Sequence, residues 1–141
     1  MSATSTSPGS AEVPALQRLT PVLIVDSVRD CLPFWTDRLG FATTAEVPGP
    51  DGSLTFAILE GSGIEIMYQS SESVLADGTV TRAELGGHSV ALFITVSSLD
   101  DVERRLDGAP VVKPRHDTFY GSTEIYVKEP GGNTVGFAQM K

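Results

Sequence analysis

The chain has 141 residues and a mass of 14.9 kDa, enough for one compact domain or two small modules that share a core. Its 18 acidic residues outnumber the 10 basic ones, and a net charge of −8 excludes nucleic acid as a partner. No apolar run is long enough to cross a membrane, and no basic segment precedes an apolar stretch near residue 1. The lone Cys31 excludes an intramolecular disulfide and a cysteine zinc cluster. We therefore expect a cytoplasmic protein that contacts neither nucleic acid nor membrane.

Residues 1–15 are rich in Ser, Thr, Ala and Pro and carry a single charge, Glu12. Such a segment cannot bury enough apolar surface to offset the entropy lost on ordering. It is predicted to be a disordered tail, with structure beginning near Leu16.

The first half of the ordered chain reads as a strand, a helix and three further strands. Leu19–Val25 is rich in β-branched residues, and Ser27–Leu39 has apolar residues at helical spacing. Because Pro33 belongs in a first helical turn, the regular helix is expected to begin near Asp30. The remaining predicted strands are Phe41–Val47, Leu54–Leu59 and Gly63–Gln69.

The second half repeats this order. A strand at Ser89–Val96 precedes a helix at Ser98–Leu106, for which Ser98 and Asp101 predict a capping box and Gly108 a C-cap. The remaining predicted strands are Val111–Val112, Ser122–Val127 and Thr134–Gln139.

The two halves align when Val25-Asp26-Ser27 is laid over Val96-Ser97-Ser98, about 70 residues further along the chain. The fold class is therefore predicted as α+β: one domain over residues 16–141, made of two βαβββ modules at 16–70 and 87–141. The linker, residues 71–86, is long for a compact domain, and a helical turn is expected at Thr81–Leu85.

Several short motifs occur in the same order as in a known family. The first half carries Phe34-Trp35 and Leu39-Gly40-Phe41, and the second carries Phe119-Tyr120-Gly121, then Glu129-Pro130-Gly131-Gly132-Asn133 and Phe137. This arrangement resembles the vicinal-oxygen-chelate superfamily, which includes glyoxalase I, extradiol dioxygenases, fosfomycin-resistance enzymes and bleomycin-resistance proteins. The resemblance implies an eight-stranded cupped mixed sheet with helices on its outer face, and a homodimer.

Enzymes of this superfamily hold a divalent metal on His and Glu side chains from four strands. The matching positions here are Thr20, Glu65, Ala91 and Gly136, of which only Glu65 keeps a ligand. His88 could substitute only through a register shift of three residues, which would reverse its strand face. The resemblance therefore implies the metal-free, bleomycin-resistance-like branch, with no metal and no cofactor.

The expected ligand-binding residues combine three polar groups, three apolar ones and a histidine. Alternation places Glu65 and Met67 on one strand face, and the resemblance implies that this face lines the cup. A solvated Glu65 and plain core packing of the apolar residues are the alternatives, while Phe34 and Trp35 are expected in the core. His116, placed in a loop with Asp117, is either an acid–base pair or a solvated turn. The predicted set is Glu65, Met67, Phe56, Phe93, His116, Tyr120 and Glu124.

The predicted function is metal-free binding or sequestration of a small apolar or aromatic, neutral-to-cationic molecule, similar to antibiotic sequestration by bleomycin-resistance proteins. Thr123 replaces an Arg that many relatives carry, which argues against an anionic ligand. One alternative is a glyoxalase-like lyase, isomerase or dioxygenase with a degenerate metal site that uses Glu65 and His88 or His116. Another is a module with an empty cup that binds only a protein. No catalytic residue is assigned.

Overall fold

The computed structural model describes residues 15–141. The tail predicted for residues 1–15 thus lies, apart from Ala15, outside the described residues. No helix in the described part is long and apolar enough to span a bilayer.

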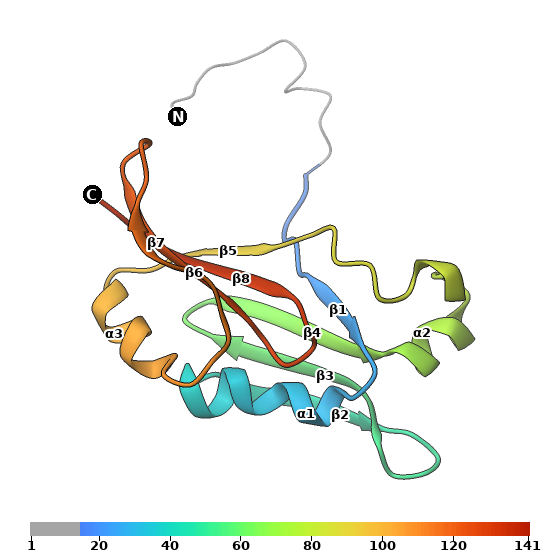
Figure 1. Cartoon of the computed structure of the whole chain (residues 1–141). Coiled ribbons are helices and arrows are strands. Elements are labelled where there is room, and N and C mark those ends of the chain that lie inside the picture. The colour runs from blue at the N-terminus through green and yellow to red at the C-terminus, as the bar shows by residue number, and fades with distance from the viewer. Residues whose placement is uncertain (1–14) are drawn as a thin grey trace.

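Two βαβββ units follow one another along the chain (Figure 1). The first consists of β1 (Val22–Val25), α1 (Val28–Pro33) continued by η2 (Phe34–Arg38), β2 (Ala42–Pro48), β3 (Leu54–Gly61) and β4 (Ile64–Ser70). The second consists of β5 (Leu92–Thr95), α3 (Leu99–Arg105), β6 (Val111–Asp117), β7 (Ser122–Lys128) and β8 (Thr134–Met140). Between them lie α2 (Ser71–Asp77) and the short η3 (Arg82–Glu84).

Each unit forms its own four-stranded mixed sheet. The strand orders are β1-β4-β3-β2 and β5-β8-β7-β6, so the two units have the same sheet topology. In each sheet the first strand pairs in parallel with the last, and the other neighbours are antiparallel. The predicted α+β class and the duplicated module are confirmed.

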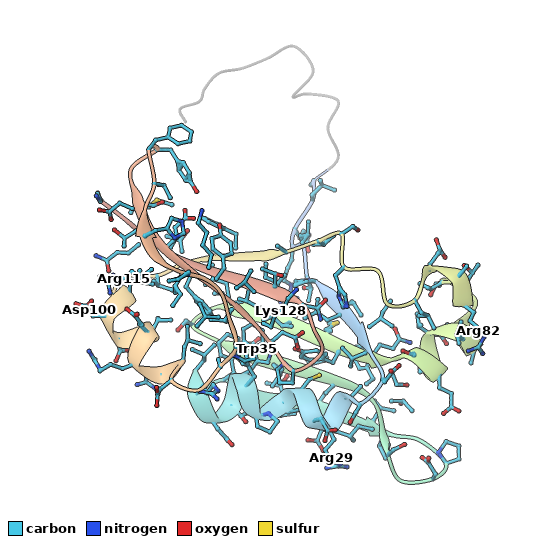
Figure 2. The ribbon with its side chains drawn as sticks, in the orientation of Figure 1. Arg29, Trp35, Arg82, Asp100, Arg115 and Lys128 are labelled. Atoms are coloured by element: carbon cyan, nitrogen blue, oxygen red, sulfur yellow. The ribbon has the colours of Figure 1, made fainter. Side chains whose placement is uncertain are left out.

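The two sheets share one apolar core on their helix-bearing sides. In β4, Ile66 and Tyr68 are buried in this core, whereas Glu65 and Met67 lie on the opposite face. Trp35 is fully buried near the centre of the molecule, which confirms its predicted core position (Figure 2). The faces directed away from the helices are therefore the ones available to a ligand.

The first helix begins earlier than predicted. Ser27 caps α1 by accepting a hydrogen bond from the amide of Asp30 at 3.3 Å, so the predicted start near Asp30 is wrong. Pro33 is the last residue of α1, and the turn that follows it is π-helical. Because Pro33 has no amide hydrogen, the helix lacks one backbone hydrogen bond at the point where it changes from α to π geometry.

The linker contains more structure than predicted. The helix α2 was not expected; Ser70 caps it by accepting from the amide of Ser73. The predicted helical turn at Thr81–Leu85 is confirmed by η3, where Glu84 accepts hydrogen bonds from Thr81.

Several predicted boundaries in the second module are also wrong. The strand predicted at Ser89–Val96 is limited to β5, because only Leu92–Thr95 pairs with β8. The strand β6 extends well beyond Val111–Val112 and includes His116, which had been placed in a loop. Its pairing with β7 tolerates Pro114 because β6 is an edge strand with register shifts.

Only one of the two hydrogen bonds of the capping box predicted for α3 is present. Ser98 accepts from the amide of Asp101, but the Asp101 carboxylate turns to Arg104 and Arg105 instead of returning to Ser98. The C-cap is Leu106, and Gly108 adopts its left-handed conformation two residues later.

Candidate functional site

A buried carboxylate lies on the helix-free face of the second sheet. Glu124 of β7 is 1% exposed, and its oxygens accept hydrogen bonds from three hydroxyl groups. The donors are Ser122 at 2.7 Å, Tyr120 at 2.8 Å and Tyr126 at 3.0 Å. Alternation along β7 places Ser122, Glu124 and Tyr126 on one face, so the strand itself assembles most of this cluster.

The hydroxyl donors keep this carboxylate charged. Burial raises the pKa of Glu124, but the hydrogen bonds from Ser122, Tyr120 and Tyr126 outweigh it and leave the pKa below its usual value. Burial, together with the bond to Glu124, raises the pKa of Tyr126 to about 12, and the same carboxylate raises the pKa of Tyr120. At neutral pH the site therefore holds an anion surrounded by neutral hydroxyls.

Glu124 borders a cavity of about 510 Å³. Its walls carry aromatic rings and a few polar groups: Val112, Lys113, His116, Asp117, Thr118, Phe119, Tyr120, Glu124 and Tyr126. A pocket of this size with a few polar groups among aromatic walls is typical of small-molecule sites.

His116 is held in place at the cavity wall. Its Nδ1 lies 2.8 Å from the carbonyl oxygen of Pro114, and a carbonyl can only accept, so Nδ1 carries the proton. The His116 and Tyr126 rings lie nearly parallel, with centroids 6.4 Å apart. The neighbouring Asp117 instead accepts from Thr123 and pairs with Lys141, so His116 and Asp117 do not form an acid–base pair.

The aromatic rim of the cavity is exposed. Phe119 is fully exposed and Tyr120 is 56% exposed, and their rings meet edge to face at 5.2 Å. Both belong to the turn between β6 and β7, which projects beyond the sheet (Figure 1). Side chains in this position can contact a ligand in the cavity without disturbing the core.

The seven predicted binding residues do not form one group within the chain. His116, Tyr120 and Glu124 line the same cavity. Phe56, Glu65 and Met67 belong to the first sheet. Phe93, on β5, is 50% exposed and pairs with Gly136.

The Glu65 carboxylate already has partners from its own chain. Thr20 donates a hydrogen bond to it at 3.0 Å, and the Arg18 guanidinium lies 3.7 Å away. The contact places Thr20 beside Glu65, as expected for two positions that match metal ligands of the superfamily's enzymes.

Sequence reasoning missed Ser122 and Tyr126 as site residues. The alternation that had been applied to Glu65 and Met67 would have found them, since they lie two residues from Glu124 on the same strand. Their hydroxyls are two of the three donors to its carboxylate.

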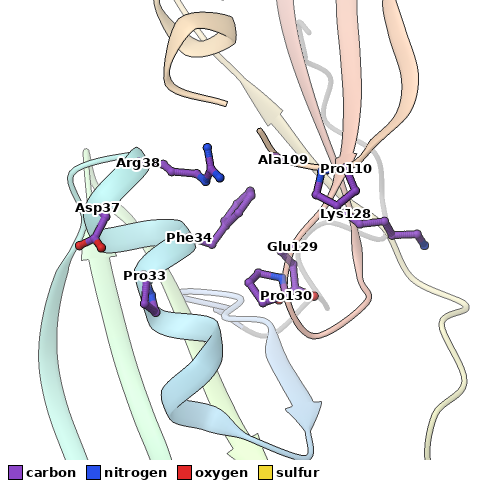
Figure 3. Close-up of a pocket in the computed structure, with 9 residues that line it drawn as sticks. All are labelled: Pro33, Phe34, Asp37, Arg38, Ala109, Pro110, Lys128, Glu129 and Pro130. Carbon is purple, nitrogen blue, oxygen red and sulfur yellow. The ribbon is translucent and has the colours of Figure 1, made fainter. Parts of the chain in front are cut away.

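A second cavity, of about 390 Å³, lies between the two modules on their helix-bearing side (Figure 3). The Phe34 ring points into it, and Pro110 and Pro130 face it from the second module. Its one buried charged group, Glu129, accepts hydrogen bonds from Tyr68, from the amide of Gly131 and from both nitrogens of Asn133. The donors to Glu129 are buried side chains and backbone amides, whereas one donor to Glu124, Tyr120, is exposed, so this cavity is a weaker candidate than the one at Glu124.

The chain is similar to known proteins in both sequence and fold. The Glyoxalase/Bleomycin resistance protein/Dioxygenase superfamily matches residues 16–137. An uncharacterized protein of Mycobacterium tuberculosis is 31% identical over 124 residues, which cover 86% of this chain and 73% of the relative. The chain therefore belongs to this superfamily.

Solved structures show the same fold at low sequence identity. A glyoxalase/bleomycin resistance protein/dioxygenase from Nocardioides superimposes with a TM-score of 0.69 at 19% identity, over 93% of this chain and 88% of that one. A lactoylglutathione lyase from Agrobacterium tumefaciens gives a TM-score of 0.68 at 17% identity, over 89% and 95% of the two chains.

The residues at the family's metal positions do not fit a divalent ion. A Cβ built on Gly136 would lie 2.3 Å from the Tyr126 ring, so that ring fills the space where a ligand side chain would stand. His88 is engaged elsewhere, with its Nδ1 3.1 Å from Asn133. Across residues 15–141, no three His, Cys, Asp or Glu side chains lie close enough together to hold a metal.

Proposed function

We propose that the protein binds and sequesters a small aromatic, neutral-to-cationic molecule without a metal, as bleomycin-resistance proteins do. The observation that carries this proposal is the ionised, buried Glu124 at the wall of an aromatic-lined cavity. The three hydroxyl donors offset the burial of this carboxylate but leave its negative charge in place, so a cation in the adjoining cavity would be attracted to it.

The other groups around the cavity agree with this ligand class. Tyr120, Tyr126 and Phe119 offer ring faces for stacking and for cation–π contacts of roughly 1–2 kcal/mol. Lys113 and Asp117 carry opposite charges, which leaves Glu124 as the remaining carboxylate of the lining. The net charge of −8 also favours the approach of cations.

A homodimer is part of the proposal. Val22, Phe93 and Met140 are 44%, 50% and 50% exposed on the faces directed away from the helices. A second copy covering these faces would bury apolar side chains and enclose the open cavity. We also propose a cytoplasmic location, supported by the single buried cysteine.

The experiment is a thermal-shift comparison of matched cationic, neutral and anionic aromatic compounds. The variants are the wild type, Glu124→Gln and, as a control, Glu46→Gln, which changes an exposed carboxylate on β2. At 100 times its dissociation constant a ligand adds about 2.7 kcal/mol of stability, which gives a clear shift. Cations should stabilise the wild type and Glu46→Gln but not Glu124→Gln. Equal responses in all three proteins, or a preference for anions, would contradict the proposal.

A further inference from the structure

We propose that Tyr120 is a gate over Glu124, and that the ligand that opens it is a hydrogen-bond-donating cation, such as a protonated amine or an amidine. The inference rests on the proposed function and specifies the ligand chemistry of that site. It excludes quaternary ammonium ions as preferred ligands, although they carry the same charge.

The first step is that Glu124 is closed to solvent. Only 1% of the residue is exposed; Tyr120 and Ser122 donate to one carboxylate oxygen and Tyr126 donates to the other. Because the carboxylate is covered, a ligand in the neighbouring cavity reaches it only when one of the covering side chains moves.

The three donors differ in how firmly they are held. Ser122 is fully buried, and its hydroxyl also contacts that of Thr118 at 2.8 Å. Tyr126 is part of β7, and its ring packs directly over Gly136. Tyr120 lies outside the strands and is 56% exposed, with Gly121 next to it at a φ of +96°. Tyr120 is therefore the donor that moves at the lowest cost.

Displacing Tyr120 removes one hydrogen bond from a buried anion. Leaving a buried charged acceptor without its donor costs more than an ordinary hydrogen bond contributes. An ammonium or amidinium N–H restores the bond and makes it charge-assisted at both ends, which strengthens it. A quaternary ammonium ion supplies charge but no N–H, so the hydrogen bond lost with Tyr120 would not be replaced.

The test uses three acridines with similar rings. They are 9-aminoacridine, a cation with N–H donors; 10-methylacridinium, a cation without them; and acridine, neutral in mildly alkaline buffer. Binding to the full chain is measured by fluorescence titration in the wild type, Tyr120→Phe, Glu124→Gln and the control Glu46→Gln.

We expect 9-aminoacridine to bind the wild type at least about tenfold more tightly than 10-methylacridinium. Tyr120→Phe keeps the ring but removes the competing hydroxyl, so both cations should bind it several-fold more tightly than the wild type. Glu124→Gln should abolish the preference between the two cations, and Glu46→Gln should change nothing.

The outcomes separate this inference from the proposed function. Equal binding of the two cations through Glu124 would overturn the donor requirement and leave the proposed function standing. Unchanged or weaker binding to Tyr120→Phe would overturn the gate. Binding of neither cation, or binding insensitive to Glu124→Gln in a protein whose circular dichroism is native, would overturn the proposed function itself. Should Glu124→Gln fail to fold, the two cations and Tyr120→Phe still decide the inference.

Discussion

The Tyr68 hydroxyl donates a hydrogen bond to the carboxylate of Glu129 and thereby joins β4 of the first module to the turn before β8 of the second. Trp35 donates to the same hydroxyl at 2.9 Å, and both nitrogens of Asn133 donate to Glu129 at 2.6 and 2.7 Å. This buried joint lies on the side opposite the candidate site and holds the two sheets in one arrangement.

Tyr68→Phe should destabilise the protein by about 1–3 kcal/mol, because Glu129 loses a donor and Trp35 its acceptor in a buried place. Urea unfolding followed by tryptophan fluorescence measures the loss. The control Glu46→Gln changes an exposed carboxylate on β2 and should leave the midpoint unchanged. If Tyr68→Phe unfolds at the wild-type midpoint, the joint contributes nothing to stability.

Part of this joint was predictable from sequence. The core position of Trp35 followed from helical spacing, and Glu129 belonged to a recognisable turn motif. Their connection through Tyr68 was not predictable, since Tyr68 and Glu129 are 61 residues apart and meet only through the packing of the two modules.

Gly136→Ala should destabilise the second sheet by about 1–3 kcal/mol through overpacking. The added Cβ would meet the Tyr126 ring at 2.3 Å, and the hydroxyl of Tyr126 donates to Glu124. Thermal unfolding of Gly136→Ala, Tyr126→Ala and the double variant measures the coupling between the two positions. Much of the cost should disappear when Tyr126→Ala makes room; strictly additive effects would show that the ring does not fill this space.

The contribution of Glu124 to stability should depend on pH in the acid range. Folding lowers the pKa of Glu124, so the unfolded chain binds this proton more readily than the folded protein. Its stabilisation is complete above the ordinary glutamate pKa of about 4.3 and is lost as the pH falls through the lower folded value. Urea unfolding across this range should show a steeper acid loss in the wild type than in Glu124→Gln. If the stability of the two proteins falls in parallel with pH, the lowered pKa of Glu124 is contradicted.

Cys31 should be inert in the native protein. Burial, followed by the negative charges of Glu129 and Asp30, raises the pKa of its thiol to about 12, so almost no thiolate forms at neutral pH. Labelling with a thiol-specific chromogenic reagent should be slow in native buffer and rapid in urea. Rapid native labelling would mean that this side of α1 opens readily.

The candidate site was predictable only within one module. The resemblance singled out Tyr120 and Glu124, and the cavity contains both. The placement of His116 in a loop was wrong because edge-strand pairing overrides the turn character of its surroundings. Phe56, Glu65 and Met67 lie on strands of the first sheet, and their part in the site stays a prediction, because strand alternation fixes only the face of one sheet and not the relation between two sheets.

The most direct test is to map where a cationic aromatic ligand binds, using amide chemical shifts of the isotope-labelled full chain during titration with 9-aminoacridine. We predict that the changes concentrate at Tyr120, Glu124 and Tyr126. Changes centred on Glu65 and Met67, or on Phe34 and Glu129 beside the cavity between the modules, would contradict it.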